Sequence, residues 1–206
     1  KEAAMQLGYY VLSHEKDHQG FLMTFDHGPE VVLDYTSNPD DLTTSLDKLE
    51  AGGGTALYDA IIEACQKNLL AAPGPGIPRR VLLVFSDGDD NLSKHSLEQA
   101  VDVALRADAR IFVVSSNGYG MNAPGDKVLQ ELVDKTNGRM YSPLEELPGS
   151  AFATGYISKH QIYESQNSVY TPGTGQYTAE IAAALTKDRK STRLNSVTAT
   201  SRMPSS

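Results

Sequence analysis

Two segments carry residues whose types and spacing suit the chemistry of a divalent metal ion. In AGGGTALYDAIIEA, residues 51–64, a triple-glycine turn presents the hydroxyl of Thr55 immediately before a helix. In RRVLLVFSDGDDN, residues 79–91, an apolar β-branched strand runs directly into Asp87 and an acidic loop. Mg²⁺ takes oxygen ligands in octahedral geometry and readily retains water. A threonine hydroxyl and a carboxylate at the end of a strand are therefore parts from which such a site is built.

Each part also has a purely structural explanation. The glycines at 52–54 are typical of a turn between helices that needs positive φ. Thr55 is placed to act as the N-cap of the helix that begins near residue 56, a role that is compatible with metal ligation. Asp87 followed by Gly88 is also typical of an ordinary turn at the end of a strand.

The acidic residues that follow are interpreted as a solvated loop rather than as further ligands. The string DGDDN partly matches a calcium-binding loop. However, Leu92 stands where such a loop requires glycine, and no glutamate follows at the usual position. Asp89 and Asp90 are therefore only accessory candidates for the metal site, together with Gly54.

The elements that must position these residues alternate between strands and helices. Periodicity and capping signals predict helices at about 3–13, 56–70, 96–107 and 126–136, and one beginning at 37–41. Strands are predicted at 20–25, 30–35, 81–85, 110–115 and 139–141, the first two as a hairpin. This alternation favours an α/β fold, with a mostly parallel sheet and helices on both faces. Ligands of such sheets bind beyond the carboxyl ends of the strands, an edge within reach of Thr55 and Asp87.

Composition narrows the classes of function. The 206 residues suit one domain, and the net charge of −8 argues against nucleic acid as a partner. No apolar run approaches the ~18 residues of a membrane-spanning helix. The single cysteine, Cys65, excludes an intrachain disulfide and is predicted to be a core residue. The five histidines lie among polar neighbours, so we expect them at the surface: His14, His18, His27, His95 and His160.

The segments GGGTALYDA, the apolar strand that ends in FSDG, and IFVVS before a further helix together resemble the von Willebrand factor A domain. The resemblance is to the bacterial, acidobacterial-type branch. It implies a doubly wound, Rossmann-like fold and a metal-ion-dependent adhesion site, in which Thr55 ligates directly and Asp87 often acts through water. The family's DxSxS loop does not occur in the chain. We therefore expect a fragment in which the first central strand, which precedes Lys1 in the family, is missing.

Boundaries within the chain follow from composition and from the same resemblance. Residues 1–187 are predicted to be a partial von Willebrand factor A domain. Within it, 142–175 have no clear periodicity and are interpreted as an irregular insertion, and 176–187 as the closing helix. The last segment, 188–206, is interpreted as a non-native tail, because DRKSTRLNS resembles the translation of a common sequencing adapter.

The resemblance implies a protein-binding module without enzymatic activity. A partner carboxylate would complete the coordination of Mg²⁺ (or Mn²⁺ or Ca²⁺), which is expected to bind this fragment weakly or not at all. Two alternatives stay open. One is a scaffold that keeps the fold without metal, and the other is a metal-assisted hydrolase that uses Asp87 with Asp89 or Asp90 and has His95 as its candidate base. No nucleophile, phosphate-loop or zinc motif supports the hydrolase. By the same resemblance, a secreted or cell-envelope location is expected.

Overall fold

The computed structural model describes residues 2–14, 18–50, 52–71, 79–117, 123–141 and 194–195. Two sheets form its centre. β1 (Gly20–Thr24) and β2 (Glu30–Thr36) pair antiparallel, as predicted for the hairpin. The second sheet has the strand order β5-β4-β3-β6, and all of its neighbours pair in parallel. Its strands are β3 (Arg79–Ser86), β4 (Ala109–Ser115), β5 (Met140–Tyr141) and β6 (Leu194–Asn195).

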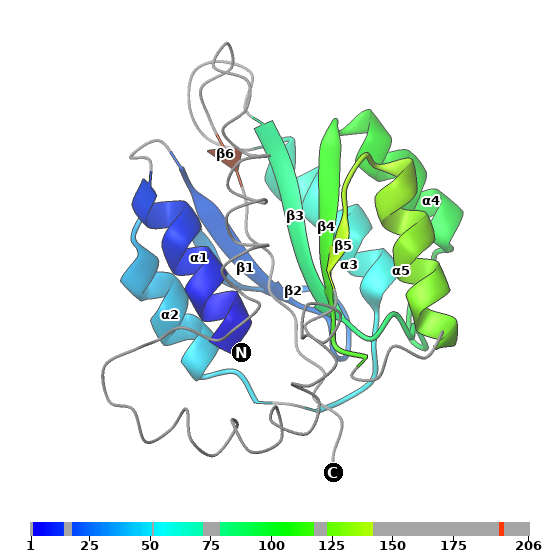
Figure 1. Cartoon of the computed structure of the whole chain (residues 1–206), viewed down its shortest axis with the longest axis horizontal. Helices are drawn as coiled ribbons and strands as arrows, with labels where there is room; N and C mark the ends of the chain where they lie inside the picture. The colour runs from blue at the N-terminus through cyan, green and yellow to red at the C-terminus, as the bar shows by residue number, and fades with distance from the viewer. Residues whose placement is uncertain are drawn as a thin grey trace, which may run out of the picture.

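Helices cover both faces of this centre, as the strand–helix alternation predicts. α1 (Glu2–His14) and α2 (Pro39–Asp47) lie on one side (Figure 1). On the other side lie α3 (Leu57–Glu63), α4 (Leu97–Arg106) and α5 (Pro124–Lys135) (Figure 1). The fold is therefore the doubly wound α/β arrangement that was expected.

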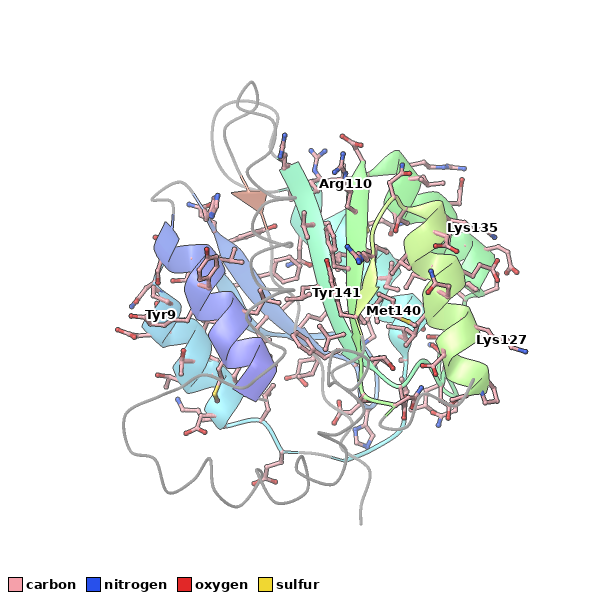
Figure 2. All side chains as sticks on the ribbon, viewed as in Figure 1. Tyr9, Arg110, Lys127, Lys135, Met140 and Tyr141 are labelled. Atoms are coloured by element: carbon pink, nitrogen blue, oxygen red, sulfur yellow. The ribbon has the colours of Figure 1, made fainter. Side chains whose placement is uncertain are left out.

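Alternate residues of β3 supply two separate cores. Val81 and Leu83 pack with the buried residues of α1 and α2, whereas Leu82 and Val84 pack with those of α3, α4 and α5. This division follows from the period of two along a strand, which sends successive side chains to opposite faces. On α5, the buried residues Leu129, Leu132 and Val133 face the sheet, and Figure 2 shows Lys127 and Lys135 on its outer side.

The helix predicted at 56–70 changes its geometry halfway. After α3, residues Ala64–Leu69 form a π-helical segment, in which Leu70 N donates to Cys65 O at 3.2 Å. Cys65 and Leu69 are fully buried, which confirms the prediction that the cysteine is a core residue.

The pairing of strands between the two sheets is relevant to the first central strand, which we expect to be missing. Among the described residues, β1 and β3 are not paired with each other, and β6 contacts both of them. Leu194 of β6 pairs with Arg79 of β3, although the sequence around Leu194 shows no strand periodicity. The irregular segment at 142–175 and the closing helix at 176–187 lie outside the described residues.

One of the histidine predictions is wrong. His18 is only 8% exposed, and its Nδ1 lies 2.8 Å from the carbonyl oxygen of Val11. The backbone of α1 supplies this buried ring with a hydrogen-bond partner, which its polar neighbours in the sequence did not indicate. His27 and His95 are largely exposed, as expected.

Candidate functional site

Thr55 lies between the end of β1 and the loop that follows β3. The amide of Ala56 donates to the carbonyl of Phe25 at 2.8 Å. The amides of Asn91 and Leu92 donate to Thr55 O at 3.0 and 2.9 Å, and Thr55 N donates to Asn91 Oδ1 at 2.8 Å. The glycine–threonine loop and the acidic loop are therefore joined by reciprocal hydrogen bonds, at the edge where the sequence predicted that they meet.

The hydroxyl of Thr55 is buried and unpartnered. Thr55 is 1% exposed, and its Oγ1 makes no hydrogen bond with the residues that the structure describes. The N-cap of α3 is Ala56, with no side-chain cap, so the interpretation of Thr55 as a capping residue is wrong. A buried hydroxyl without a partner costs about 1–3 kcal/mol. The lone pairs of this oxygen are therefore not used by any of the described groups of the protein.

The acidic loop caps α3 in place of Thr55. Tyr58 N donates to Asp90 Oδ2 at 3.0 Å, and Asp59 N donates to Ser93 Oγ at 3.0 Å. The Asp90 carboxylate also accepts from Ser93 N at 3.0 Å and from Ser93 Oγ at 2.7 Å. A carboxylate at the positive end of a helix is favourable in itself. The expectation of a solvated loop is therefore wrong at Asp90, since both oxygens of this carboxylate are engaged within the protein.

Asp87 and Asp89 are less constrained. The half-buried Asp87 carboxylate accepts from Asp89 N at 3.2 Å, and Asp89 itself is exposed. Gly88 has a φ of 84°, and its amide donates to Ser86 Oγ at 3.1 Å. The interpretation of Asp87 and Gly88 as a strand-end turn is confirmed. This turn leaves most of the acceptor capacity of the Asp87 carboxylate available.

Two glycines shape the glycine–threonine loop. A Cβ on Gly54 would lie 2.5 Å from Leu92 Cδ1 and 2.7 Å from Asn91 Oδ1, so a larger residue would force these side chains of the acidic loop to shift. Gly53 has a φ of 78°, the left-handed conformation that the sequence predicted for this turn. Gly54 thus leaves room for the side chains of Asn91 and Leu92.

His95 is bound to Asp59 at the start of α3. Its Nδ1 lies 2.7 Å from Asp59 Oδ1, and the amides of Lys94 and His95 donate to the same carboxylate at 3.1 Å. Burial raises the pKa of Asp59, but the hydrogen bonds from His95 and from these amides outweigh it and hold the pKa below its ordinary value. Sequence reasoning did not single out Asp59, because its partners lie more than thirty residues away.

Sequence reasoning also missed Asn117 and Asp126, which lie next to Asp87. Asn117 Nδ2 donates to the carbonyl of Asp87 and to Asp126 Oδ1, both at 2.8 Å. Asn117 follows β4, and the carboxyl ends of parallel strands meet at one edge. That rule could have identified Asn117 from its position after the strand.

The donor set fits a hard cation better than a soft one. Within the described ranges, no three or more His, Cys, Asp or Glu side chains are grouped closely enough to hold a metal ion. Among the described candidate residues, the Thr55 hydroxyl makes no hydrogen bond, and the Asp87 carboxylate accepts only from the Asp89 amide. Hydroxyl and carboxylate oxygens, completed by water, are ligands of the kind that Mg²⁺ prefers.

Residues 2–89 match the family described as von Willebrand factor type A domain. Over these residues the chain is similar to a von Willebrand factor A domain. Domains of this family generally mediate protein–protein interactions. None of the curated proteins matches the sequence.

Two solved structures share this fold at low sequence identity. An aerotolerance-related membrane protein from Bacteroides fragilis is 18% identical with a TM-score of 0.54, over 77% of this chain and 86% of that chain. The conserved hypothetical protein BatB from Bacteroides thetaiotaomicron is 16% identical with a TM-score of 0.51, over 86% and 87%. Among the described residues of this chain, no helix combines the length and apolarity needed to cross a membrane.

Proposed function

We propose that this von Willebrand factor A domain is a metal-ion-dependent protein-binding module. Thr55 and Asp87 would hold Mg²⁺, or Mn²⁺ or Ca²⁺ in its place, and a carboxylate of the partner protein would complete the coordination. The observation that carries the proposal is the Thr55 hydroxyl: Thr55 is 1% exposed, and this hydroxyl has no hydrogen-bond partner among the described residues. A buried polar atom without a partner calls for an explanation, and a bound cation supplies one.

Each candidate residue would have a different role in binding the ion. Thr55 would ligate directly, and Asp87 would hold the ion directly or through water. Asp89 is an exposed accessory candidate, whereas Asp90 is committed to capping α3. The bound ion would supply a positive centre that attracts an acidic side chain. Since only one hydroxyl and one carboxylate are in place, we expect weak binding of the ion.

A metal-free scaffold is the second candidate function. It is favoured by the finding that the described residues hold no group of three or more acidic, histidine or cysteine side chains suited to a metal. The hydrolase hypothesis has less support, because His95 is bound to Asp59 rather than to Asp87. For location we propose the cell envelope or the exterior; the support is that one structural neighbour is described as a membrane protein.

The test is a titration of the isotopically labelled chain with Mn²⁺, followed by NMR, because paramagnetic broadening detects even weak binding. We expect the amides of Thr55 and Gly88 to broaden first, and an excess of Mg²⁺ to reverse the effect. Thr55→Val and Asp87→Ala should each abolish this local broadening and leave the remaining spectrum unchanged. Asp102→Asn is the matched control, since it removes an exposed carboxylate on α4.

Two outcomes would contradict the metal site. Broadening that is spread over all acidic surfaces, and that persists in Asp87→Ala, would show only nonspecific binding of cations. No effect up to about 10 mM Mn²⁺, well above the range of weak extracellular cation sites, would favour the metal-free scaffold.

A further inference from the structure

We infer that Asn117 is a positioning residue for Asp87, and that Asp126 holds Asn117 in place. The inference rests on the proposed function, because the position of the Asp87 carboxylate matters most if this carboxylate binds an ion. Asn117 acts on the backbone of Asp87, and hence on the direction in which its side chain leaves the end of β3.

The contacts form a closed network between β3, β4 and α5. The side-chain amide of Asn117 donates to Asp87 O and to Asp126 Oδ1, each at 2.8 Å. Ser115, which is 2% exposed, donates through Oγ to Asp126 Oδ1 and accepts from Asn117 N, both at 3.1 Å. Every group of the network lies on a regular element or within two residues of one, so the Asp87 carbonyl is held by a rigid frame.

The orientation of the Asn117 amide is determined by its partners. A carbonyl oxygen and a carboxylate oxygen both require a donor, and only the NH₂ group of the amide supplies two. Asn117 is therefore chemically suited to this position. An aspartate there would set its charge against that of Asp126 and could not donate to Asp87.

The peptide bond between Asp87 and Gly88 also packs against α5, because Gly88 and Gly125 lie in close contact. A Cβ on Gly125 would lie 2.1 Å from Asp87 O, and a Cβ on Gly88 would lie 2.2 Å from Gly125 O. These distances are far below van der Waals contact, so the first turn of α5 touches the Asp87–Gly88 peptide directly. Gly125 and Asn117 thus fix the same carbonyl from two sides.

The experiment measures the loop without metal. In metal-free protein, the Asp89 amide donates to Asp87 Oδ1 and the Gly88 amide donates to Ser86 Oγ. Asn117→Ala should therefore speed hydrogen exchange at these two amides by on the order of tenfold, the effect of losing one hydrogen bond that holds the loop. Gln130→Ala is the matched control: it removes a 2.7 Å amide–carboxylate bond on the exposed side of α5 and should leave both amides unchanged.

A charge-exchanged pair separates positioning from simple stabilisation. Asn117→Asp combined with Asp126→Asn restores a hydrogen bond between the two side chains but cannot donate to Asp87 O. The thermal stability of this double variant should recover relative to Asn117→Asp alone, while the fast exchange of Gly88 and Asp89 persists. Recovery of slow exchange in the double variant would overturn the inference.

A second variant and a second measurement keep the test independent of the proposed function. Gly125→Ala leaves Asn117 in place but displaces the Asp87 carbonyl, and it should speed the same exchange.

If the parent chain binds Mn²⁺ at Thr55 and Asp87, Asn117→Ala should weaken that binding by about 10- to 100-fold, as for other residues that orient metal ligands. If Mn²⁺ binds nowhere near Asp87, the proposed function fails, while the exchange rates still decide the role of Asn117. Unchanged exchange in both Asn117→Ala and Gly125→Ala would refute that role.

Discussion

Two buried threonines differ in whether the side-chain hydroxyl has a hydrogen-bond partner. Thr136 is 2% exposed; its Oγ1 donates to Leu132 O at 2.9 Å and accepts from Ile111 N at 3.3 Å. Thr55 is equally buried, but its Oγ1 has no partner in the described part of the chain. The hydrogen-bonded hydroxyl of Thr136 is favourable for folding. The unpaired hydroxyl of Thr55 is unfavourable, because a buried hydroxyl loses its bonds to water. An unpaired oxygen of this kind is typical of a site where stability is given up for function.

The difference predicts opposite effects of the same substitution. In the absence of metal, Thr55→Val should leave the free energy of unfolding unchanged or raise it by up to about 1 kcal/mol, since it removes an unpaired hydroxyl and keeps the shape. Thr136→Val should lower that free energy by about 1–3 kcal/mol, because it leaves the Ile111 amide without its acceptor. Urea denaturation in the presence of EDTA measures both. A comparable loss for Thr55→Val would mean that its hydroxyl has a structural partner.

At the scale of elements, α3 and the acidic loop form one unit. α3 has seven residues and no capping side chain of its own. Asp90 and Ser93 bind its first amides, and Asp59 on the helix binds the loop in return. A helix this short is marginal by itself, so its stability depends on these tertiary contacts. The same contacts place the Thr55 loop beside the end of β3.

The Asp59–His95 contact makes this unit sensitive to pH. Because the pKa of Asp59 is lower in the folded protein than its ordinary value of 3.8, ionised Asp59 stabilises the fold above that value. This contribution is lost as the pH falls through the folded-state pKa. Asp59→Asn should therefore unfold more easily than the parent at pH 7, by up to about 1 kcal/mol for a contact near solvent. Urea denaturation should show the difference shrinking below about pH 4. A gap that persisted at pH 2 would assign the effect to shape rather than to charge.

At the scale of the whole molecule, both faces of the sheets are closed by well-packed cores. Cys65 lies in the core beneath α3, with no exposed surface. Burial raises the pKa of its thiol to about 12, an effect that the nearby Arg80 only partly offsets. Since the thiolate is the reactive form, Cys65 is both inaccessible and protonated in the folded chain.

Cys65 therefore reports on opening of the fold. Its reaction with a disulfide reagent at pH 8 should be more than ~100-fold slower in native buffer than in 6 M guanidinium chloride, because both access and ionisation are suppressed. Rapid reaction of the native chain would show that the π-helical segment opens locally without global unfolding. The chain contains one cysteine, so no other thiol contributes to the signal.

Local patterns determined most of the fold. Apolar periodicity placed the helices and strands, and the strand–helix alternation predicted helices on both faces. The capping signal at Asn38 and Pro39 located the start of α2, where Asn38 accepts from Asp40 N. After α5, Asn137 has a φ of 54°, the left-handed conformation that is typical of a residue following a helix and that asparagine tolerates well. These features depend on residues that are close together in the chain, so the order of residues is sufficient to predict them.

The tertiary structure alone decided how the residues of the candidate site are used. From the sequence, Thr55 looked like a helix cap and Asp90 like a solvated side chain. In the fold, Asp90 caps α3, and the Thr55 hydroxyl is left without a partner. Position after β4 could place Asn117 at the same edge as Asp87, but the hydrogen bond between them is seen only in the fold. Each of these contacts joins residues about thirty positions apart. Whether such groups meet depends on how strands and loops pack, which no local periodicity encodes.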